Sequence, residues 1–236
     1  MTVDKSGERV KRMFGEIAPH YDRMNHLLSM NVDRYWRWRT VRLVRPVPEI
    51  PILDLCTGTG DLAFAFYRYT KGQTPIIAAD FCPEMLAIGK EKKRQAGLTG
   101  EIEFVEADAE NLPFMNECFQ VVSVAFGLRN VSDTDRGIRE MIRVLRPGGK
   151  LAVLEFSQPG WQPFKALYGW YFRNVLPRLG QWFARNQSQA YSYLPESVGE
   201  FPSGQALANR LQACGLSSVK FYPFTFGIAT LYLGVK

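Results

Sequence analysis

The chain has 236 residues, a net charge of +6 and an apolar fraction of 46%, which fits one large domain with a sizeable core. No apolar run reaches the roughly 18 residues of a membrane-spanning helix, and we expect no secretory signal because no apolar segment follows the start. Four cysteines without C-x-x-C spacing and only two histidines argue against a zinc knuckle, a disulfide framework or a histidine-rich metal site, and indicate free thiols in a cytoplasmic protein.

The first segment, residues 4–45, is predicted to be helical, with Asp33 as the N-cap of its last helix. A proline-containing linker follows at 46–51. Strands and helices then alternate, which predicts a parallel sheet with both faces covered. The predicted strands lie at 52–56, 75–80, 102–106, 119–126 and 151–156, with helices at 60–70, 83–96 and 133–145 and a turn at 146–150.

The rhythm changes after the fifth strand. Residues 157–200 are aromatic and interrupted by prolines, which indicates short helical pieces. A helix near 203–214 precedes two strands, 217–224 and 227–235, which we predict to form an antiparallel hairpin. The result is a seven-stranded, mostly parallel sheet that ends in a hairpin.

Residues 52–61 are the most informative segment: a short apolar run contains Asp54 and leads into a tight glycine turn. Gly58 and Gly60 can adopt a positive φ and let a ligand approach the backbone. Asp80 closes the next apolar run, where a carboxylate can hold both hydroxyls of a ribose. The pattern predicts a nucleoside cofactor; the alternative is an ordinary turn with a surface acid.

The same turn also satisfies the loose G-x-G-x-x-[GA] pattern of dinucleotide binders. Two acids favour S-adenosylmethionine instead. Asp108, followed by the small Ala109, can accept from an adenine amino group and leave room for the ring. Asp54 lies inside the expected pocket, where a carboxylate would repel a pyrophosphate but suits a zwitterionic sulfonium cofactor. The terminal hairpin is likewise typical of the class I S-adenosylmethionine-dependent methyltransferases.

Six segments also carry a family likeness. They are FGEIAPHYDRMN at 14–25, LDLCTGTGD at 53–61, FGLRNV at 126–131, LEFSQP at 154–159, VLP at 175–177 and YSYLPES at 191–197. Over nearly the whole chain, they resemble the C-methyltransferases of ubiquinone and menaquinone biosynthesis. The glycine turn is shared with many methyltransferases, whereas the segments at 126–131 and 191–197 are more specific.

This resemblance implies a single methyltransferase domain over 1–236. It would comprise a helical lid (1–45), a cofactor-binding core (50–156), a substrate insertion (157–202) and a C-terminal helix and hairpin (203–236).

The resemblance also implies that Thr59, Asp80, Asp108 and Ala109 contact the cofactor. The family often has serine where Ala125 stands, and asparagine in place of Asp108.

By the same resemblance, the activity is methyl transfer to a ring carbon of demethylmenaquinol; the alternative acceptor is a 2-methoxy-6-polyprenyl-1,4-benzoquinol. The acceptor must be the reduced quinol, because a quinone ring is too electron-poor to react. Arg129, after the fourth strand, is the candidate for stabilising a developing phenolate or holding a water that Asn130 orients. Tyr21 is a candidate lid contact. The alternative for Arg129 is a surface ion pair with Asp133 or Asp135.

The partners follow from charge and aromatic content. Basic residues interleaved with aromatics, near the N-terminus and at 165–185, predict peripheral contact with the inner face of a membrane, where a polyprenyl quinol resides. The Arg-Tyr-Trp-Arg-Trp-Arg run at 34–39 and a pI near 9.2 leave an RNA or protein methyltransferase as an alternative, although we expect no nucleic acid. A non-catalytic membrane-associated binding protein is a third hypothesis, and a homodimer stays open.

Overall fold

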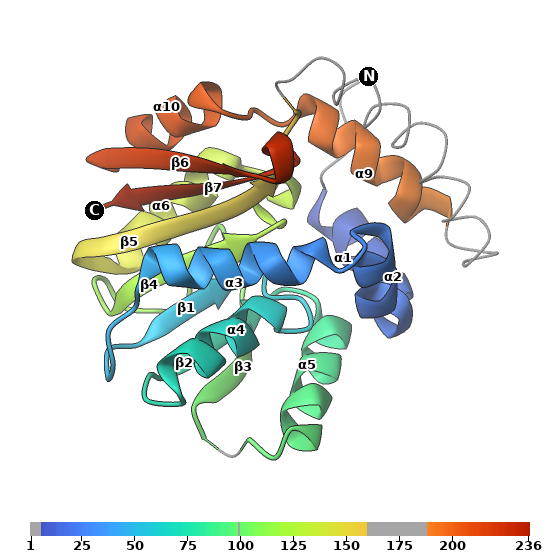
Figure 1. Ribbon diagram of the computed structural model, residues 1–236, viewed down its shortest axis with the longest axis horizontal. Helices are drawn as coiled ribbons and strands as arrows, with labels where there is room; N and C mark the ends of the chain where they lie inside the picture. Colours follow the sequence, from blue (N-terminus) through green and yellow to red (C-terminus); the bar gives the residue numbers. More distant parts are fainter. Residues whose placement is uncertain (1–5, 99, 160–187) are drawn as a thin grey trace.

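The computed structural model describes residues 6–98, 100–159 and 188–236 (Figure 1). Its sheet has seven strands in the order β3-β2-β1-β4-β5-β7-β6; β7 runs antiparallel to both β5 and β6, and the other pairs are parallel. The strands are β1 (Ile52–Leu55), β2 (Ile76–Asp80), β3 (Ile102–Glu106), β4 (Phe119–Ala125), β5 (Leu145–Phe156), β6 (Ser218–Phe224) and β7 (Ala229–Val235). The predicted sheet and hairpin are confirmed.

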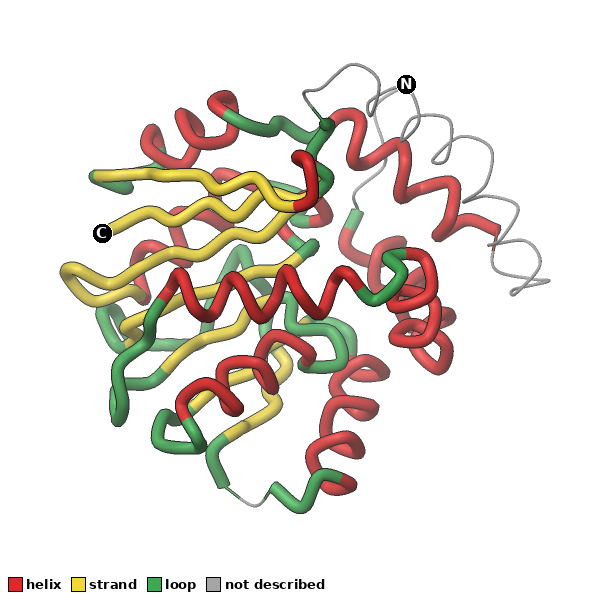
Figure 2. Tube along the Cα trace, in the orientation of Figure 1, coloured by secondary structure: helices red, strands yellow, loops and turns green. Residues whose placement is uncertain are grey.

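Helices cover both faces of this sheet (Figure 2). The helices that precede β3 in the chain are α1 (Gly7–Ile17), α2 (Tyr21–Leu28), α3 (Val32–Val44), α4 (Asp61–Thr70) and α5 (Pro83–Gln95). The later ones are α6 (Thr134–Val144), α9 (Ser188–Glu200) and α10 (Gln205–Ala213), and short 3-10 turns are η1 (Ala18–His20), η2 (Leu128–Asn130) and η4 (Thr225–Gly227). Among the described residues, no helix is both long and apolar enough to cross a membrane.

Two apolar cores result from the alternation of side chains along each strand. In β1, Ile52 points to the face covered by α3 and α4, and Leu53 to the face covered by α6 and α10. Because β1 is buried on both faces, its residues are apolar except for the buried Asp54, and they do not alternate with exposed polar ones. Each large side chain buried in this way contributes about 1.5–3 kcal/mol. The two cores hold the carboxyl ends of the parallel strands at one edge.

Two local predictions were wrong. Asn31, in the left-handed conformation, precedes α3, and Asp33 lies inside its first turn, buried against His26 and Arg37 rather than capping the helix. β5 already begins at Leu145, so the predicted turn at 146–150 is part of an irregular strand. The backbone N–H of Gly148 donates to the carbonyl of Lys236, so residues after Pro147 pair with the chain end.

The predicted aromatic insertion lies mostly outside the described residues. Its last part is helical: α9 continues through Pro195. The division of the chain into lid, core and insertion stays a prediction.

Candidate active site

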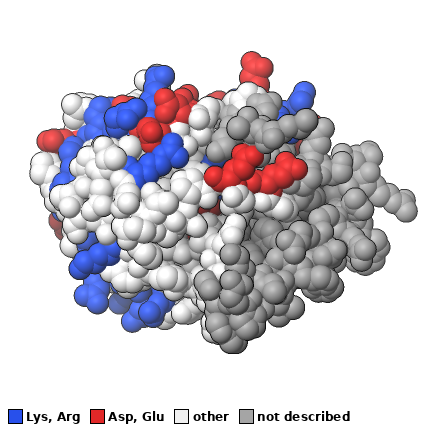
Figure 3. Space-filling view, turned by 90° about the horizontal axis from the view of Figure 1, so that it is seen from above, with Lys and Arg blue, Asp and Glu red and all other residues white. Residues whose placement is uncertain are grey.

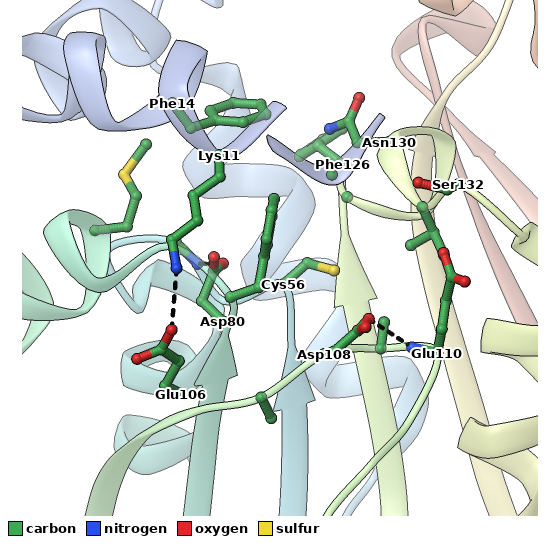
Figure 4. A pocket seen from close by; sticks show the side chains of 18 of the residues that line it. Lys11, Phe14, Cys56, Asp80, Glu106, Asp108, Glu110, Phe126, Asn130 and Ser132 are labelled. Atoms are coloured by element: carbon green, nitrogen blue, oxygen red, sulfur yellow. Dashed lines mark hydrogen bonds and ion pairs between the residues drawn. The ribbon is translucent and has the colours of Figure 1, made fainter. Parts of the chain in front are cut away.

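A cavity of about 500 Å³ opens at the carboxyl ends of β1, β2 and β4, beneath α1 (Figure 4). This is the edge at which open parallel sheets bind ligands, and the volume lies in the usual range for ligand pockets. Lys11 and Phe14 of α1 border it from above. The predicted site residues that line it are Tyr21, Gly58, Asp80, Asp108, Ala109 and Asn130.

Glycine is favoured at positions 58 and 60 of the turn for different physical reasons. Both have positive φ, +57° at Gly58 and +89° at Gly60. A Cβ at Gly58 would meet only Tyr21, at 3.8 Å, so the cavity reaches this backbone. A Cβ at Gly60 would come within 2.8 Å of the Phe104 ring, so packing alone requires glycine there. Gly60 does not line the cavity, and its contact with the cofactor stays a prediction.

Thr59, between them, is 2% exposed. Its hydroxyl donates to Asp22 at 2.6 Å and accepts from Lys92 at 3.1 Å, which ties the turn to α2 and α5. It lines a smaller side cavity rather than the main one.

Asp80 is fixed by backbone donors. Its two carboxylate oxygens accept from the N–H groups of Gly58, at 2.8 Å, and Cys82, at 3.0 Å. Burial raises the pKa of Asp80 although these bonds oppose the shift. The group is thus held rigidly at the end of β2, where it can accept from hydroxyls of a ligand. Asp108 is exposed at the cavity rim and accepts from the N–H of Glu110 at 2.9 Å.

The N-terminal helices close over this edge through ion pairs. Lys11 of α1 reaches Glu106 of β3 at 3.1 Å (Figure 4). Lys92 of α5 binds Asp22 of α2 at 2.9 Å and Asp61 of α4 at 2.6 Å. Burial of Asp61 opposes ionisation, but Arg37 and Lys92 outweigh it and lower its pKa. These contacts join α1 and α2 to the sheet edge and to α5, and the lid itself stays a prediction.

The family description "ubiE/COQ5 methyltransferase family" matches residues 1–236. The chain belongs to this family. It is 41% identical over 234 residues to the ubiquinone/menaquinone biosynthesis C-methyltransferase UbiE of Geotalea daltonii, with 99% of each chain covered. It is 39% identical over 232 residues to the demethylmenaquinone methyltransferase of Bacteroides fragilis, with 98% of this chain and 94% of that protein covered.

Solved structures agree on the fold. The S-adenosylmethionine-dependent methyltransferase structure from Methanococcus maripaludis superposes with a TM-score of 0.65 at 17% identity, over 100% of this chain and 97% of that one. A structure from Thermotoga maritima, described as a possible histamine N-methyltransferase, superposes with a TM-score of 0.66 at 17% identity, over 95% of this chain and 98% of that one. This protein is therefore an S-adenosylmethionine-dependent C-methyltransferase of class I fold.

The residues of the main cavity fit that cofactor. Asp80 provides acceptors for the ribose hydroxyls, and Asp108 beside Ala109 provides an acceptor for the adenine amino group. The exposed backbone of Gly58 leaves room for a close approach. The contacts of these individual residues with the cofactor remain predictions, but all four residues line one cavity.

Arg129 is placed differently from the sequence prediction. It is 5% exposed and does not line the cavity. Its guanidinium pairs with Glu155 of β5 at 2.7 Å and donates to the carbonyl of Phe126. The alternative, a surface ion pair with Asp133 or Asp135, was wrong: the pair is buried, Asp133 caps α6 and Asp135 pairs with Arg210. Arg129 therefore supports the loop after β4 from below.

Asn130 does reach the cavity. The hydroxyl of Tyr193 in α9 donates to its Oδ1 at 3.0 Å. With the oxygen engaged there, the amide N–H₂ is the group that Asn130 can offer to a ligand.

Sequence reasoning did not name several residues that line the cavity, among them Phe14, Cys56 and Phe126. Cys56 and Phe126 directly follow β1 and β4 and have positive φ, +51° and +57°. A Cβ at Gly127 would come within 2.4 Å of Cys56, so the two strand ends pack directly against each other. Non-glycine residues in this conformation are typical of functional loops, but the conformation has no signal in one sequence.

Proposed function

We propose that this methyltransferase acts on a ring carbon of demethylmenaquinol. The observation that carries the proposal is the composition of the main cavity: the cofactor-side carboxylate of Asp80 shares it with the aromatic rings of Phe14, Tyr21 and Phe126. Such walls suit a planar, electron-rich ring. The names of the relatives from Bacteroides fragilis and Porphyromonas gingivalis, both demethylmenaquinone methyltransferases, support the same acceptor.

The cofactor supplies an electrophilic methyl group, so that a carbon–carbon bond forms as the carbon–sulfur bond breaks and the ring carbon then loses its proton. The protein must hold the ring carbon in line with the methyl group at near-attack distance. It must also donate a hydrogen bond to the quinol oxygen on which negative charge develops. Neither task requires a covalent enzyme intermediate.

Two residues are proposed for the second task. Burial raises the pKa of Tyr21, so its phenol stays protonated near neutral pH and acts as a hydrogen-bond donor, not as a base. The amide of Asn130, oriented by Tyr193, is a second donor. Both can stabilise a developing phenolate.

Arg129 is proposed to contribute through the loop that presents Phe126 and Asn130. The sequence predicted a direct role for Arg129, in which it stabilises the developing phenolate or holds a water, and this role has a separate test. Loss of turnover in Arg129→Lys with cofactor affinity and unfolding free energy unchanged would support the direct part.

The alternative acceptor is a methoxybenzoquinol of ubiquinone biosynthesis. It is favoured by the relatives named ubiquinone/menaquinone biosynthesis C-methyltransferase, which include those of Geotalea daltonii and a Geobacter strain.

Peripheral contact with the inner face of a membrane is proposed because a polyprenyl quinol resides in the bilayer. Tyr35 and Trp38 of α3 are 47% and 49% exposed and stack at 6.0 Å, and Arg42 lies 4.9 Å from the Trp38 ring. Aromatic and basic side chains in this combination suit an anionic lipid surface. The face in Figure 3 has a broad uncharged area, bordered by both basic and acidic side chains. Co-sedimentation with anionic and neutral vesicles, compared for the wild type and Trp38→Ser, tests this contact. Sedimentation velocity tests whether the homodimer, which the sequence leaves open, forms.

The acceptor is tested by incubating the purified protein with labelled S-adenosylmethionine and short-tail demethylmenaquinol, kept reduced, beside the matching methoxybenzoquinol and bulk RNA. Label in the naphthoquinol supports the proposal. Label only in the benzoquinol moves the enzyme to the alternative, and label only in RNA contradicts both. Asp80→Asn, expected to lose cofactor affinity, is the matched inactive control.

A further inference from the structure

The Phe126 side chain borders the main cavity and also belongs to a cluster of three aromatic rings (Figure 4). Its ring centroid lies 4.4 Å from that of Phe156 at the end of β5 and 5.9 Å from that of Trp36 in α3. Trp36 and Phe156 meet edge to face, with their centroids 6.2 Å apart. Such ring pairs attract each other beyond the effect of their buried area. Trp36 and Phe156 do not line the cavity, so they can act on a ligand there through Phe126.

Trp36 is held at its polar end as well. The residue is 3% exposed, and its indole N–H donates to the hydroxyl of Thr225 in η4 at 2.8 Å. A buried indole N–H usually finds such a partner, because leaving it unpaired costs free energy. The indole therefore cannot turn away from the Phe126 ring without losing this hydrogen bond.

The backbone is strained on both sides of Trp36. Phe126 has a φ of +57° and Thr225 a φ of +46°. This left-handed region is uncommon for residues other than glycine, and a β-branched residue such as threonine is a genuine outlier there. Strained conformations persist where the surrounding structure fixes them, and they cluster at functional sites. Here one strained residue places a hydroxyl against the indole of Trp36, and the other places a ring between Trp36 and the cavity.

We infer that Trp36 is a positioning residue for the methyl acceptor: it holds the Phe126 ring as a fixed platform on which the acceptor ring stacks. The inference rests on the proposed function, in which the main cavity takes a planar quinol ring beside the cofactor. A fixed platform matters for the rate because transfer requires the ring carbon to be in line with the methyl group. A misplacement of about 1 Å can lower the rate roughly 100-fold.

The test is steady-state kinetics with short-tail demethylmenaquinol, kept reduced, at saturating S-adenosylmethionine. Trp36→Leu removes the indole from the Phe126 ring and should lower kcat by roughly 10- to 100-fold. The Kd of S-adenosylhomocysteine, measured by isothermal titration, should change less than about twofold. Trp36→Phe keeps an aromatic ring in contact with Phe126 and should recover most of the lost kcat.

Phe119→Leu is the matched control for a loss of core packing. Trp36 belongs to a buried apolar core, so Trp36→Leu should also lower the free energy of unfolding. Phe119 lies at the other end of β4 from Phe126, is 4% exposed and meets the ring of Phe114 edge to face at 5.3 Å. Its replacement should lower the free energy of unfolding as well but leave kcat unchanged.

An unchanged kcat in Trp36→Leu, or an equal loss of kcat in Phe119→Leu, would overturn the inference. Weaker binding of S-adenosylhomocysteine to Trp36→Leu, in proportion to the lost turnover, would also overturn it, because Trp36 would then act on the cofactor. If Trp36→Leu does not fold, Thr225→Val decides: it removes the acceptor for the indole N–H at nearly constant volume. A lowered kcat in Thr225→Val supports the inference, and an unchanged kcat overturns it. A wild type that binds S-adenosylhomocysteine but methylates no quinol would overturn the proposed function and the inference together.

Discussion

Replacing Glu155 with glutamine should destabilise the protein far more than any surface acid would. Glu155 and Arg129 are 1% and 6% exposed in their side chains and pair at 2.7 Å. Glu155 also accepts from the N–H of Phe156 at 2.9 Å. Glutamine keeps an acceptor at this position but removes the charge, so the guanidinium stays buried without its counter-ion.

The magnitude follows from that uncompensated charge. Breaking a buried pair from one side costs roughly 3–5 kcal/mol, and the remaining hydrogen bond places Glu155→Gln near the lower end, at about 3 kcal/mol. For a chain of this length, the melting temperature should fall by roughly 6–12 °C. Urea unfolding followed by circular dichroism measures the free energy directly, with an unchanged denaturant slope as the check on two-state behaviour.

Two companion variants make the reasoning refutable. Glu91→Gln removes a carboxylate from the exposed pair with Arg94 and should have no measurable effect. Adding Arg129→Met to Glu155→Gln removes the orphaned cation and should recover most of the loss. A loss below about 1 kcal/mol in Glu155→Gln, or a double variant less stable than the single one, would refute the account.

Three further outcomes are expected. Burial raises the pKa of Asp54 to about 6, so its neutral form is favoured on folding; the resulting stability is present below the unfolded pKa and is lost as the pH rises to about 6. Asp54→Asn should therefore remove up to about 3 kcal/mol of the decline in unfolding free energy between pH 4 and 7, and an unchanged pH slope would contradict this. Gly89→Ala would place a Cβ 2.3 Å from the Phe104 ring and should cost about 1–3 kcal/mol in urea unfolding, whereas Gly199→Ala, with nothing within 4 Å, should not destabilise. Asp80→Asn should weaken S-adenosylhomocysteine binding about 10- to 100-fold in titration; unchanged affinity would remove Asp80 from the site.

The secondary structure followed from local pattern. An apolar run that contains Asp54 and another that ends at Asp80 predicted β1 and β2, because buried parallel strands need no polar alternation. Pro83 at the start of α5 and Gly97 just beyond its end gave nearly correct boundaries. These signals depend on neighbours in the chain and need no knowledge of the fold.

Part of the site followed from the same logic. The carboxyl ends of parallel strands meet at one edge, so Gly58, Asp80 and Asp108 could be assigned to one cavity from their positions after β1, β2 and β3. The sequence also predicted a class I methyltransferase and its cofactor, and membership of the family confirms both.

Tertiary structure alone decided which partner each charged side chain meets. Arg129 faces Glu155, 26 residues further along the chain, because β4 and β5 are adjacent in the sheet. Arg37 enters the side cavity because α3 packs against α4 and against β5 and β7 of the sheet, although Arg37 lies within a run that resembles a solvated basic face. Charge pairing depends on distance in space, and one sequence specifies this only through the complete fold.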